Sequence, residues 1–171
     1  MNMSRTTLAL ALASAASLVA VGSPALAATG TTATTAPTQC VLVLDEVKPG
    51  ESVSDVSLHK CFSGPGASAR ATAAVPAAAA QTELMIWAED ANWGGAYTRI
   101  YGNGGTCDAS GYSFSPNSWW SSRLSSFTLE GACNRSFLRG PRGNGSFSGQ
   151  LVGYVGDSLN DAVDYIKIWR G

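Results

Sequence analysis

Hydrophobic and polar residues alternate with a period of two through most of the second half of the chain. The alternation is clearest in the segments 83–87, 96–102 and 162–169. It places successive side chains on opposite faces of an extended strand. The segments 123–133 and 150–156 are further strand candidates, and turns that contain glycine separate these segments. Short strands at this spacing predict a β-sandwich or barrel, with no convincing helix between residues 83 and 171.

The segment 40–62 has the pattern of a hairpin. Two strand-like runs flank the turn Lys48-Pro49-Gly50-Glu51, in which proline fixes φ and glycine takes the conformation that other residues avoid. Cys40 and Cys61 then fall at the open end of the hairpin. Because an isolated hairpin is only marginally stable in water, we expect it either to be closed by a disulfide or to dock on the main domain.

Three stretches lack the pattern of a folded unit. Residues 1–27 have a basic start, an apolar run and small residues at Ala25 and Ala27, which is typical of a signal peptide cleaved after Ala27. Residues 28–39 are rich in threonine and alanine and predict a disordered lead-in. Residues 63–82 are alanine-rich with interspersed proline and glycine, and they predict a linker, with a short helix at 77–81 as the alternative.

Aromatic residues mark the main domain. All five tryptophans, all five tyrosines and four of the five phenylalanines lie between residues 83 and 171. Because aromatic side chains supply much of the buried area of a small core, the folded domain is predicted at 83–171.

The chain carries little charge. It has 11 basic and 12 acidic residues, and loss of Arg5 with the signal peptide changes the formal net charge from −1 to about −2. Such a surface gives no electrostatic attraction for nucleic acid or anionic lipid. No segment after the signal is long and apolar enough to span a bilayer. We therefore expect a secreted, extracellular monomer with no nucleic-acid or membrane partner.

The four cysteines predict two disulfides. An even number of cysteines in an exported chain favours paired thiols, and three pairings are possible. The pairs Cys40–Cys61 and Cys107–Cys133 are favoured, because each closes a short local loop and the predicted linker separates them. A metal centre at the cysteines is disfavoured, since none has C-x-x-C spacing and His59 is the only histidine.

The segment 83–171 contains a weak internal duplication. Each half has an aromatic-rich strand, a hairpin with an aromatic-x-Gly motif, a loop of small polar residues and a final strand. Two copies of about 40 residues predict a pair of Greek keys.

These motifs resemble the microbial βγ-crystallin fold. Its hairpin has the pattern aromatic, four residues, aromatic, any residue, glycine, and "AEDANWGG" at 88–95 is similar, although Ala88 stands where the first aromatic is expected. The residues that carry the hairpin motif in the two halves are Trp87, Trp93, Gly95, Phe147 and Gly149. The resemblance implies an all-β fold of two Greek-key motifs forming a βγ-crystallin-like sandwich, here preceded by a small disulfide-closed hairpin.

The resemblance also implies two weak calcium sites. The family's loop, (Asn/Asp)-(Asn/Asp)-x-x-(Ser/Thr)-Ser, is similar to residues 121–126 and 160–165. One site would use the Glu89 and Arg123 carbonyls with the side chains of Ser125 and Asp161, and the other the Ala162 carbonyl with Asp164 and Ser122. Because each site has at most one carboxylate, we expect weak binding or none, and no required cofactor.

The same resemblance implies a non-enzymatic binding function. Some secreted bacterial members are proteinase inhibitors, and the chain is similar to the disulfide-bonded ones in its export signal, small size, glycine content and bridged domain. An extracellular proteinase is therefore the expected partner. A calcium-binding structural or stress protein of the cell envelope and a small secreted toxin are the alternatives.

No catalytic residue is predicted. Gly156-Asp157-Ser158-Leu159 matches the name-giving motif of an esterase family, but His59 lies upstream in a different segment and offers no base to Ser158. Glu89 and Asp90 are adjacent, and adjacent strand residues point to opposite faces, so we expect them not to act as an acid/base pair. We expect His59 to be an exposed polar residue. The chain lacks a constellation of acid, base and nucleophile.

Two further motifs have structural and functional interpretations. Trp119-Trp120 is expected to pack in the core or at an edge, with a contact surface for sugar or protein as the alternative. Arg135, Arg139 and Arg142 surround a Gly/Pro turn, which is either solvated or the protruding loop of an inhibitor. We favour the solvated turn.

Overall fold

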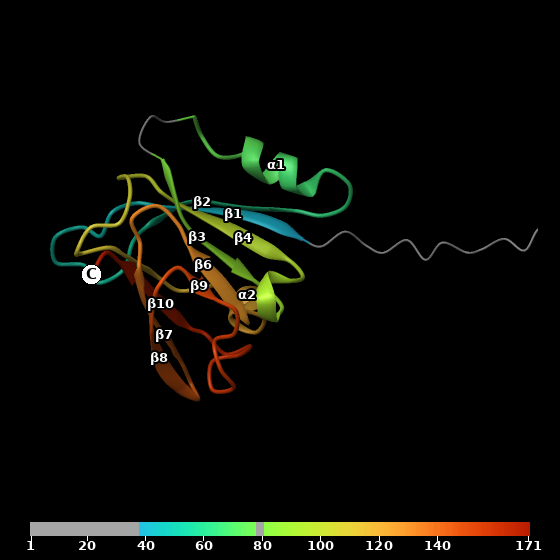
Figure 1. The fold of residues 1–171 in the computed structure, drawn as a ribbon. Helices are drawn as coiled ribbons and strands as arrows, with labels where there is room; N and C mark the ends of the chain where they lie inside the picture. The colour runs from blue at the N-terminus through green and yellow to red at the C-terminus, as the bar shows by residue number, and fades with distance from the viewer. Residues whose placement is uncertain (1–37, 78–80) are drawn as a thin grey trace, which may run out of the picture. The chain divides into compact units, whose positions relative to one another are not determined.

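The computed structural model describes residues 38–77 and 81–171, which fold mainly into strands (Figure 1). The predicted signal peptide at 1–27 and residues 28–37 of the predicted lead-in lie outside the described residues. The strands are β1 Gln39–Leu44, β2 Val56–Phe62, β3 Thr82–Ala88, β4 Tyr97–Gly102, β5 Tyr112–Phe114, β6 Ser126–Leu129, β7 Arg135–Gly140, β8 Gly143–Ser148, β9 Leu151–Val152 and β10 Tyr165–Trp169. The helical segments are α1 Ala67–Ala73, the 3₁₀ turn η1 Ala91–Trp93 and α2 Ser118–Ser121.

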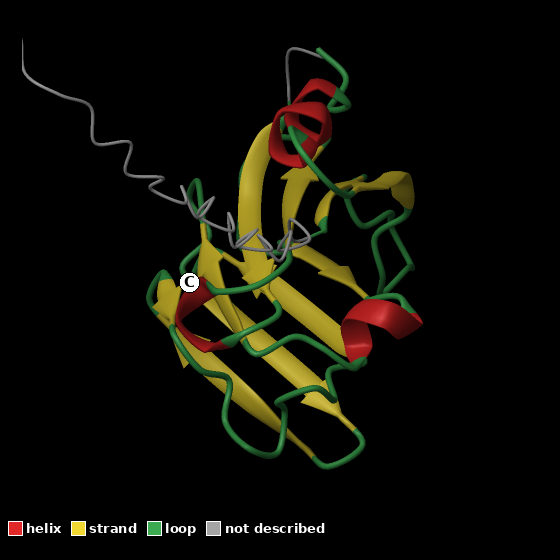
Figure 2. Cartoon of the chain, turned by 90° about the vertical axis from the view of Figure 1, so that its right-hand side faces the viewer, coloured by secondary structure: helices red, strands yellow, loops and turns green. Residues whose placement is uncertain are grey.

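The described strands form two sheets, in agreement with the predicted all-β class. A six-stranded sheet has the order β2-β1-β4-β3-β6-β9, and a four-stranded sheet has the order β5-β10-β7-β8. Figure 2 shows the short helical segments around the strands, outside both sheets. The helices α1 and α2 correct two expectations, namely that 63–82 is a linker and that 83–171 has no helix.

The last eight strands form two sets of four, β3–β6 and β7–β10, and the third strand of each set lies in the sheet of the other set. β3, β4 and β6 lie in the large sheet, whereas β5 pairs with β10 in the small sheet. Reciprocally, β7, β8 and β10 lie in the small sheet, whereas β9 pairs with β6 in the large one. The orders β4-β3-β6-β9 and β8-β7-β10-β5 are therefore equivalent. The duplication in the sequence has a counterpart in the strand topology.

The core lies between the two sheets. The Trp87 ring of β3 is 5.7 Å from the Phe114 ring of β5, and the Phe127 ring of β6 is 5.5 Å from the Phe147 ring of β8. Trp87, Phe114 and Phe127 are fully buried, and the partly buried Phe147 packs against this core from the edge strand of the small sheet. Burial of each large side chain contributes roughly 2 kcal/mol relative to exposure, so these cross-sheet contacts hold the layers together.

The hairpin β1–β2 is part of the large sheet and not a separate unit. β1 pairs in parallel with β4, with Gln39 opposite Tyr97 and Leu44 opposite Gly102. Every residue of β1 is buried, and Leu42 and Leu44 belong to the main core. A continuous apolar run suits a strand covered on both faces. The hairpin is thus both docked on the main domain and closed by the Cys40–Cys61 disulfide. The predicted lead-in 28–39 overlaps the start of β1 at Gln39.

Helix α1 lies within the predicted linker 63–82. Ala67 and Ala71 are four residues apart, which places them on one helical face, and both are buried. The helix contacts β1 and β2. Alanine side chains are small enough to allow this close approach but too small to give a clear amphipathic signal in the sequence. The alternative helix at 77–81 falls largely on residues 78–80, outside the described part of the chain. Among the described residues, no helix is long and apolar enough to cross a membrane.

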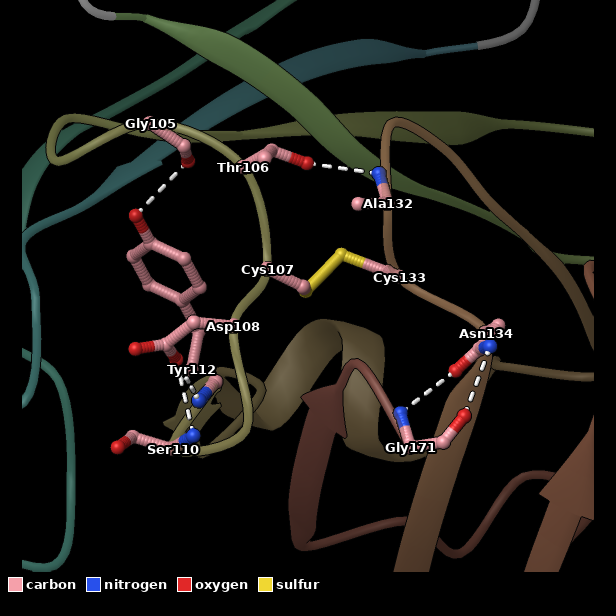
Figure 3. Close-up of a disulfide and its surroundings, with 11 residues drawn as sticks. Gly105, Thr106, Cys107, Asp108, Ser110, Tyr112, Ala132, Cys133, Asn134 and Gly171 are labelled. Carbon is pink, nitrogen blue, oxygen red and sulfur yellow. Dashed lines mark hydrogen bonds between the residues drawn. A yellow bond between two sulfur atoms is a disulfide. The ribbon is translucent and has the colours of Figure 1, made fainter.

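Two disulfides join the pairs that the spacing favours. Cys40 and Cys61 are directly opposed residues of β1 and β2. Cys107 and Cys133 link the loop after β4 to the loop before β7 (Figure 3). Beside the second disulfide, the Ala132 N–H donates to Thr106 Oγ1 at 2.7 Å, which further ties the two loops together. The two strand sets are therefore connected covalently as well as by packing.

Candidate functional site

An open cavity of about 350 Å³ lies where the turn after β3 meets the loops before β6 and β10. Its lining residues are Glu89, Asp90, Ala91, Ser122, Arg123, Ser125, Asn160 and Asp161. Five of the seven residues predicted to surround calcium are among them, namely Glu89, Ser122, Arg123, Ser125 and Asp161. The fold thus brings together one hairpin and two loops that are distant in the sequence.

The turn after β3 is shaped by residues with positive φ. Asn92, Trp93 and Gly95 have φ of 55°, 64° and 74°. The Trp93 N–H donates to Ser126 Oγ at 3.0 Å, and its indole Nε1–H donates to the Phe127 carbonyl at 3.2 Å. Trp93 is 44% exposed, so it fastens the turn to β6 by hydrogen bonds more than by burial.

Trp87 and Ala88 do not cover this turn. Trp87 packs in the core, with its ring 5.4 Å from the ring of Trp120. Ala88 is buried at the end of β3. The missing aromatic of the hairpin motif is therefore not replaced by Trp87.

Two of the carbonyls predicted as ligands accept no hydrogen bond from a described residue. Four neighbouring carbonyls accept hydrogen bonds. The Ala88 carbonyl accepts from Ser125 N–H, and the Asp90 carbonyl accepts from Ser126 Oγ. The Leu124 carbonyl accepts from Asp161 N–H, and the Ser125 carbonyl accepts from Val155 N–H. The carbonyl oxygens of Glu89 and Arg123 accept none from any described residue. The Ala96 N–H, which would otherwise reach the Glu89 carbonyl, donates instead to Glu89 Oε2 at 3.2 Å.

Ser125 adds an unpaired hydroxyl to the cavity wall. The residue is buried, with a relative exposure of 6%, and no described residue forms a hydrogen bond with its Oγ. The described side-chain atoms that are both buried and without a partner do not include this Oγ, so solvent reaches the hydroxyl. One hydroxyl and two carbonyls at the cavity are therefore without protein hydrogen-bond partners.

An ion pair neutralises part of the cavity's charge. Arg123 donates to Glu89 Oε1 at 2.7 Å, and its guanidinium lies 4.6 Å from the centre of the Trp119 ring. The pair is partly exposed and contributes at most about 1 kcal/mol. Asp90 and Asp161 also line the cavity, and no ion pair to a described residue neutralises either of them. The wall is therefore net acidic.

The structure corrects the expectation that Glu89 and Asp90 point to opposite faces. β3 ends at Ala88, so strand alternation no longer governs the two residues that follow. Both residues line the cavity. Glu89 is nevertheless held by Arg123, and the Asp90 carboxylate lies over Gly95. Both acids therefore help to form the turn.

The residues of the second predicted calcium site have other partners. The Ala162 carbonyl packs against Gly140, where a Cβ would lie only 1.8 Å from the oxygen. Asp164 pairs with Arg139 at 3.2 Å. Ser122 Oγ donates to the carbonyls of Ser118 and Trp119. The described contacts do not assemble these three ligands, because the small sheet's hairpin packs directly on the 160–165 loop.

The remaining motifs have structural partners. Trp120 is fully buried, while Trp119 is 38% exposed and packs edge-on against it at 4.9 Å. The arginine-rich segment forms the hairpin β7–β8, in which Arg142 donates to the carbonyls of Asp157 and Asn160. Ser158 lies beside Gly143.

His59 lies against one of the disulfides. In the described part of the chain, Cys40, His59 and Cys61 form a group whose ligand atoms lie within 4.8 Å of one another. Both sulfurs are joined in the disulfide, so they offer no thiolate to a metal ion.

Comparison of the chain with family models, with curated proteins and with solved structures gives no match. The resemblance to βγ-crystallins therefore depends on the sequence motifs.

Proposed function

We propose that this chain is a secreted, non-enzymatic protein of βγ-crystallin type and that its loop cavity binds one calcium ion. The single observation that carries the proposal is that the carbonyls of Glu89 and Arg123 accept no hydrogen bond from a described residue and belong, with Ser125, to residues that line one cavity. Four nearby carbonyls have hydrogen-bond donors, whereas the Ser122 carbonyl, which also belongs to a cavity-lining residue, accepts none from a described residue.

The strand topology supports the family assignment in this proposal. Two Greek keys that exchange their third strands would give two sheets of equivalent order, as in β4-β3-β6-β9 and β8-β7-β10-β5. β1 and β2 extend the first of these sheets at its β4 edge. The hairpin would then be an addition to the family's two-sheet framework.

The donor set suits a hard cation. Calcium takes six to eight oxygen ligands from carboxylates, carbonyls, hydroxyls and water. Glu89 and Arg123 would supply carbonyls, Ser125 a hydroxyl and Asp161 a carboxylate, with water completing the shell. Because the set has one carboxylate, a dissociation constant of about 1 mM is expected, in the range of extracellular modules. The bound ion would hold the hairpin and both loops together and so stabilise the fold.

Proteinase inhibition stays a prediction. It derives from the resemblance to secreted inhibitors, and no described contact favours it, because Arg139 and Arg142 are tied to the molecule's own acceptors. Titration against extracellular metallo- and serine proteinases tests it, and it fails if none is slowed at micromolar protein.

Thermal unfolding with and without calcium tests the calcium proposal. With a dissociation constant of 1 mM, 10 mM calcium should stabilise the protein by about 1.4 kcal/mol, or roughly 4 °C in Tm. Magnesium at equal concentration should give a smaller shift, because it demands tighter geometry. Asp161→Asn should abolish the calcium shift. Asp157→Asn, which removes the same charge from the same turn outside the cavity, should retain it. No shift in the unmodified chain, or an equal shift in Asp161→Asn, rejects the proposal.

A further inference from the structure

The outer face of the small sheet consists of aromatic and cationic side chains. On the inner face, Ser136 and Leu138 of β7 and Ile166 and Ile168 of β10 are fully buried. Strand alternation therefore directs the intervening residues away from the core. These residues are exposed or only partly buried, and they are Arg135, Phe137 and Arg139 of β7 and Tyr165, Lys167 and Trp169 of β10.

Aromatic and cationic residues alternate on this face in both directions. β7 and β10 are the two central strands of the small sheet, and each directly opposed outward pair joins one ring to one cation. The pairs are Arg135 with Trp169, Phe137 with Lys167 and Arg139 with Tyr165. The exposed polar residues of β8 that continue the face beside β7 are Asn144, Ser146 and Ser148.

The rings help to hold the cations in place. The guanidinium carbon of Arg139 lies 4.9 Å from the centre of the Tyr165 ring, and Lys167 Nζ lies 5.8 Å from the centre of the Trp169 ring. The Phe137 ring packs against Tyr165, with ring centres 6.4 Å apart. Cation–π contacts of this kind order a long side chain without neutralising its charge.

The face is positively charged. The four strands of the small sheet contain Arg135, Arg139 and Lys167 and no aspartate or glutamate. Asp164, which precedes β10, pairs with Arg139, whereas Arg135 and Lys167 form no ion pair with any described residue. Three cations less one carboxylate leave a formal charge of about +2 on this face, although the whole chain has −1. An anionic partner is therefore complementary to it.

The arrangement favours a carboxylated polysaccharide over other polyanions. Single-stranded nucleic acid stacks its bases on open aromatic rings, but Arg139 and Lys167 lie over two of the three rings here. Attraction to an anionic membrane usually takes a cluster of about four to eight cations. Lysine is depleted at the core of protein interfaces, and Lys167 occupies the middle of this face. Carboxylates match the planar fork of arginine, and the hydroxyl and amide groups of β8 can bind sugar hydroxyls.

We propose that the outer face of the small sheet binds a linear polysaccharide that carries carboxylate groups. Positions two apart on a strand are separated by about 6.6 Å and neighbouring strands by about 4.8 Å, so the three cations form a zigzag row about 13 Å long. Arg135 and Lys167 contact successive carboxylates, and the partly exposed Phe137 ring gives an apolar contact to a sugar ring. No residue of this face lines the loop cavity, so the site is independent of the proposed calcium site.

Calorimetric titration of the full chain with oligogalacturonate tests this proposal. EDTA is present throughout, because carboxylated sugars and the loop cavity are both candidates for calcium binding. The methyl-esterified oligomer has the same backbone without the charges and is the matched neutral probe. The chain should bind the acidic oligomer, with an affinity that falls as salt is added. It should bind neither the ester nor monomeric galacturonate at the same concentration, because a single sugar reaches only one cation.

Substitutions test the residues of the face. Lys167→Gln and Arg135→Gln should each weaken binding of the acidic oligomer about threefold, which is the effect of one ion pair at a surface. Lys60→Gln removes the same charge from an exposed position of β2 in the large sheet and should leave the affinity unchanged. The proposal is overturned if the acidic oligomer does not bind, if the ester binds equally well, or if Lys60→Gln weakens binding as much as Lys167→Gln. Tighter binding of single-stranded oligodeoxythymidylate than of the acidic oligomer would also overturn it.

Discussion

Gly95 illustrates how one backbone position controls the loop cavity. Its φ of +74° disfavours any side chain, and a Cβ there would lie 2.8 Å from Asp90 Oδ2 and 3.0 Å from Glu89 Cβ. Both neighbours line the cavity. The aromatic-x-Gly motif identified this residue in the sequence, because glycine is the residue that adopts positive φ without strain.

Gly95→Ala should therefore destabilise the protein by more than a backbone effect alone. Gly149 is a matched control, since it has a φ of +99° and no atom within 4 Å of an added Cβ. Gly149→Ala should cost about 1–2 kcal/mol and Gly95→Ala about 1 kcal/mol more. Denaturant unfolding measures both. Equal losses would show that the Asp90 contact imposes no constraint.

His59 should make stability depend on pH in a narrow window. Burial lowers its pKa in the folded state, so folding disfavours the proton. Stability should be highest above the ordinary imidazole pKa of about 6.5 and should fall as the pH drops from there toward the lowered value. His59 is the only histidine, so His59→Gln should flatten the profile between about pH 5.5 and 7.5. An unchanged slope in the variant would assign the effect to other groups.

At the residue scale, the sequence predicts the chemistry of the loop cavity better than its contacts. The loop motif identified Ser125 and Asp161, which do meet at the cavity. It did not predict the Glu89–Arg123 ion pair, because side chains that come from separate loops meet only after the fold has formed. The motif also placed Ala162 in a second calcium site. The sequence around Ala162 does not indicate that Gly140 packs against its carbonyl, because the two residues are distant in the sequence.

At the scale of elements, period-two alternation was a reliable guide and composition was not. β4 and β10 lie within the segments predicted from alternation, and β3 extends beyond the predicted segment 83–87 by one residue at each end. α1 was missed because an alanine-rich segment with proline on both sides has the composition of a linker. Its alanine face becomes buried only through contact with β1 and β2. β5 was missed because three residues are too few to show a period.

The two disulfides offer a test of how cross-links stabilise these elements. Their sequence separations are 26 and 21, so loop entropy predicts a contribution of about 3 kcal/mol from each. Their surroundings in the folded state differ, since Cys40–Cys61 joins two paired strands and Cys107–Cys133 joins two loops. If the unfolded state dominates, Cys107→Ala/Cys133→Ala and Cys40→Ala/Cys61→Ala should lower the free energy of unfolding by amounts within about 0.5 kcal/mol of each other. Denaturation curves measure both, and a much larger gap would indicate that native contacts dominate.

At the scale of the whole molecule, the sequence suggested two units where the structure has a continuous sheet. The alanine-rich segment and the aromatic distribution placed a boundary near residue 83. The parallel pairing of β1 with β4 crosses that boundary. Such pairing joins residues distant in the sequence, so local pattern cannot reveal it. The exchange of β5 and β9 between the sheets is equally non-local.

The continuous sheet predicts that the hairpin unfolds together with the rest of the described domain. Every residue of β1 is buried, and its leucines belong to the main core. Native-state hydrogen exchange should therefore give the amides of β1 opening free energies within about 1 kcal/mol of those in β3. Opening of β1 at a cost lower by more than 2 kcal/mol would instead identify the hairpin as a separately unfolding unit.

The parallel pairing of β1 with β4 also constrains the order in which the molecule assembles. The β1–β2 hairpin closes through neighbours in the sequence, and such local closure is fast. The hairpin can join the large sheet only after β3 and β4 have formed, because β1 pairs with β4. Contacts between segments this far apart raise the contact order and slow folding. We therefore expect β1, the first described strand, to form early and to take its final place late, with the Cys40–Cys61 disulfide keeping it paired with β2 during that interval.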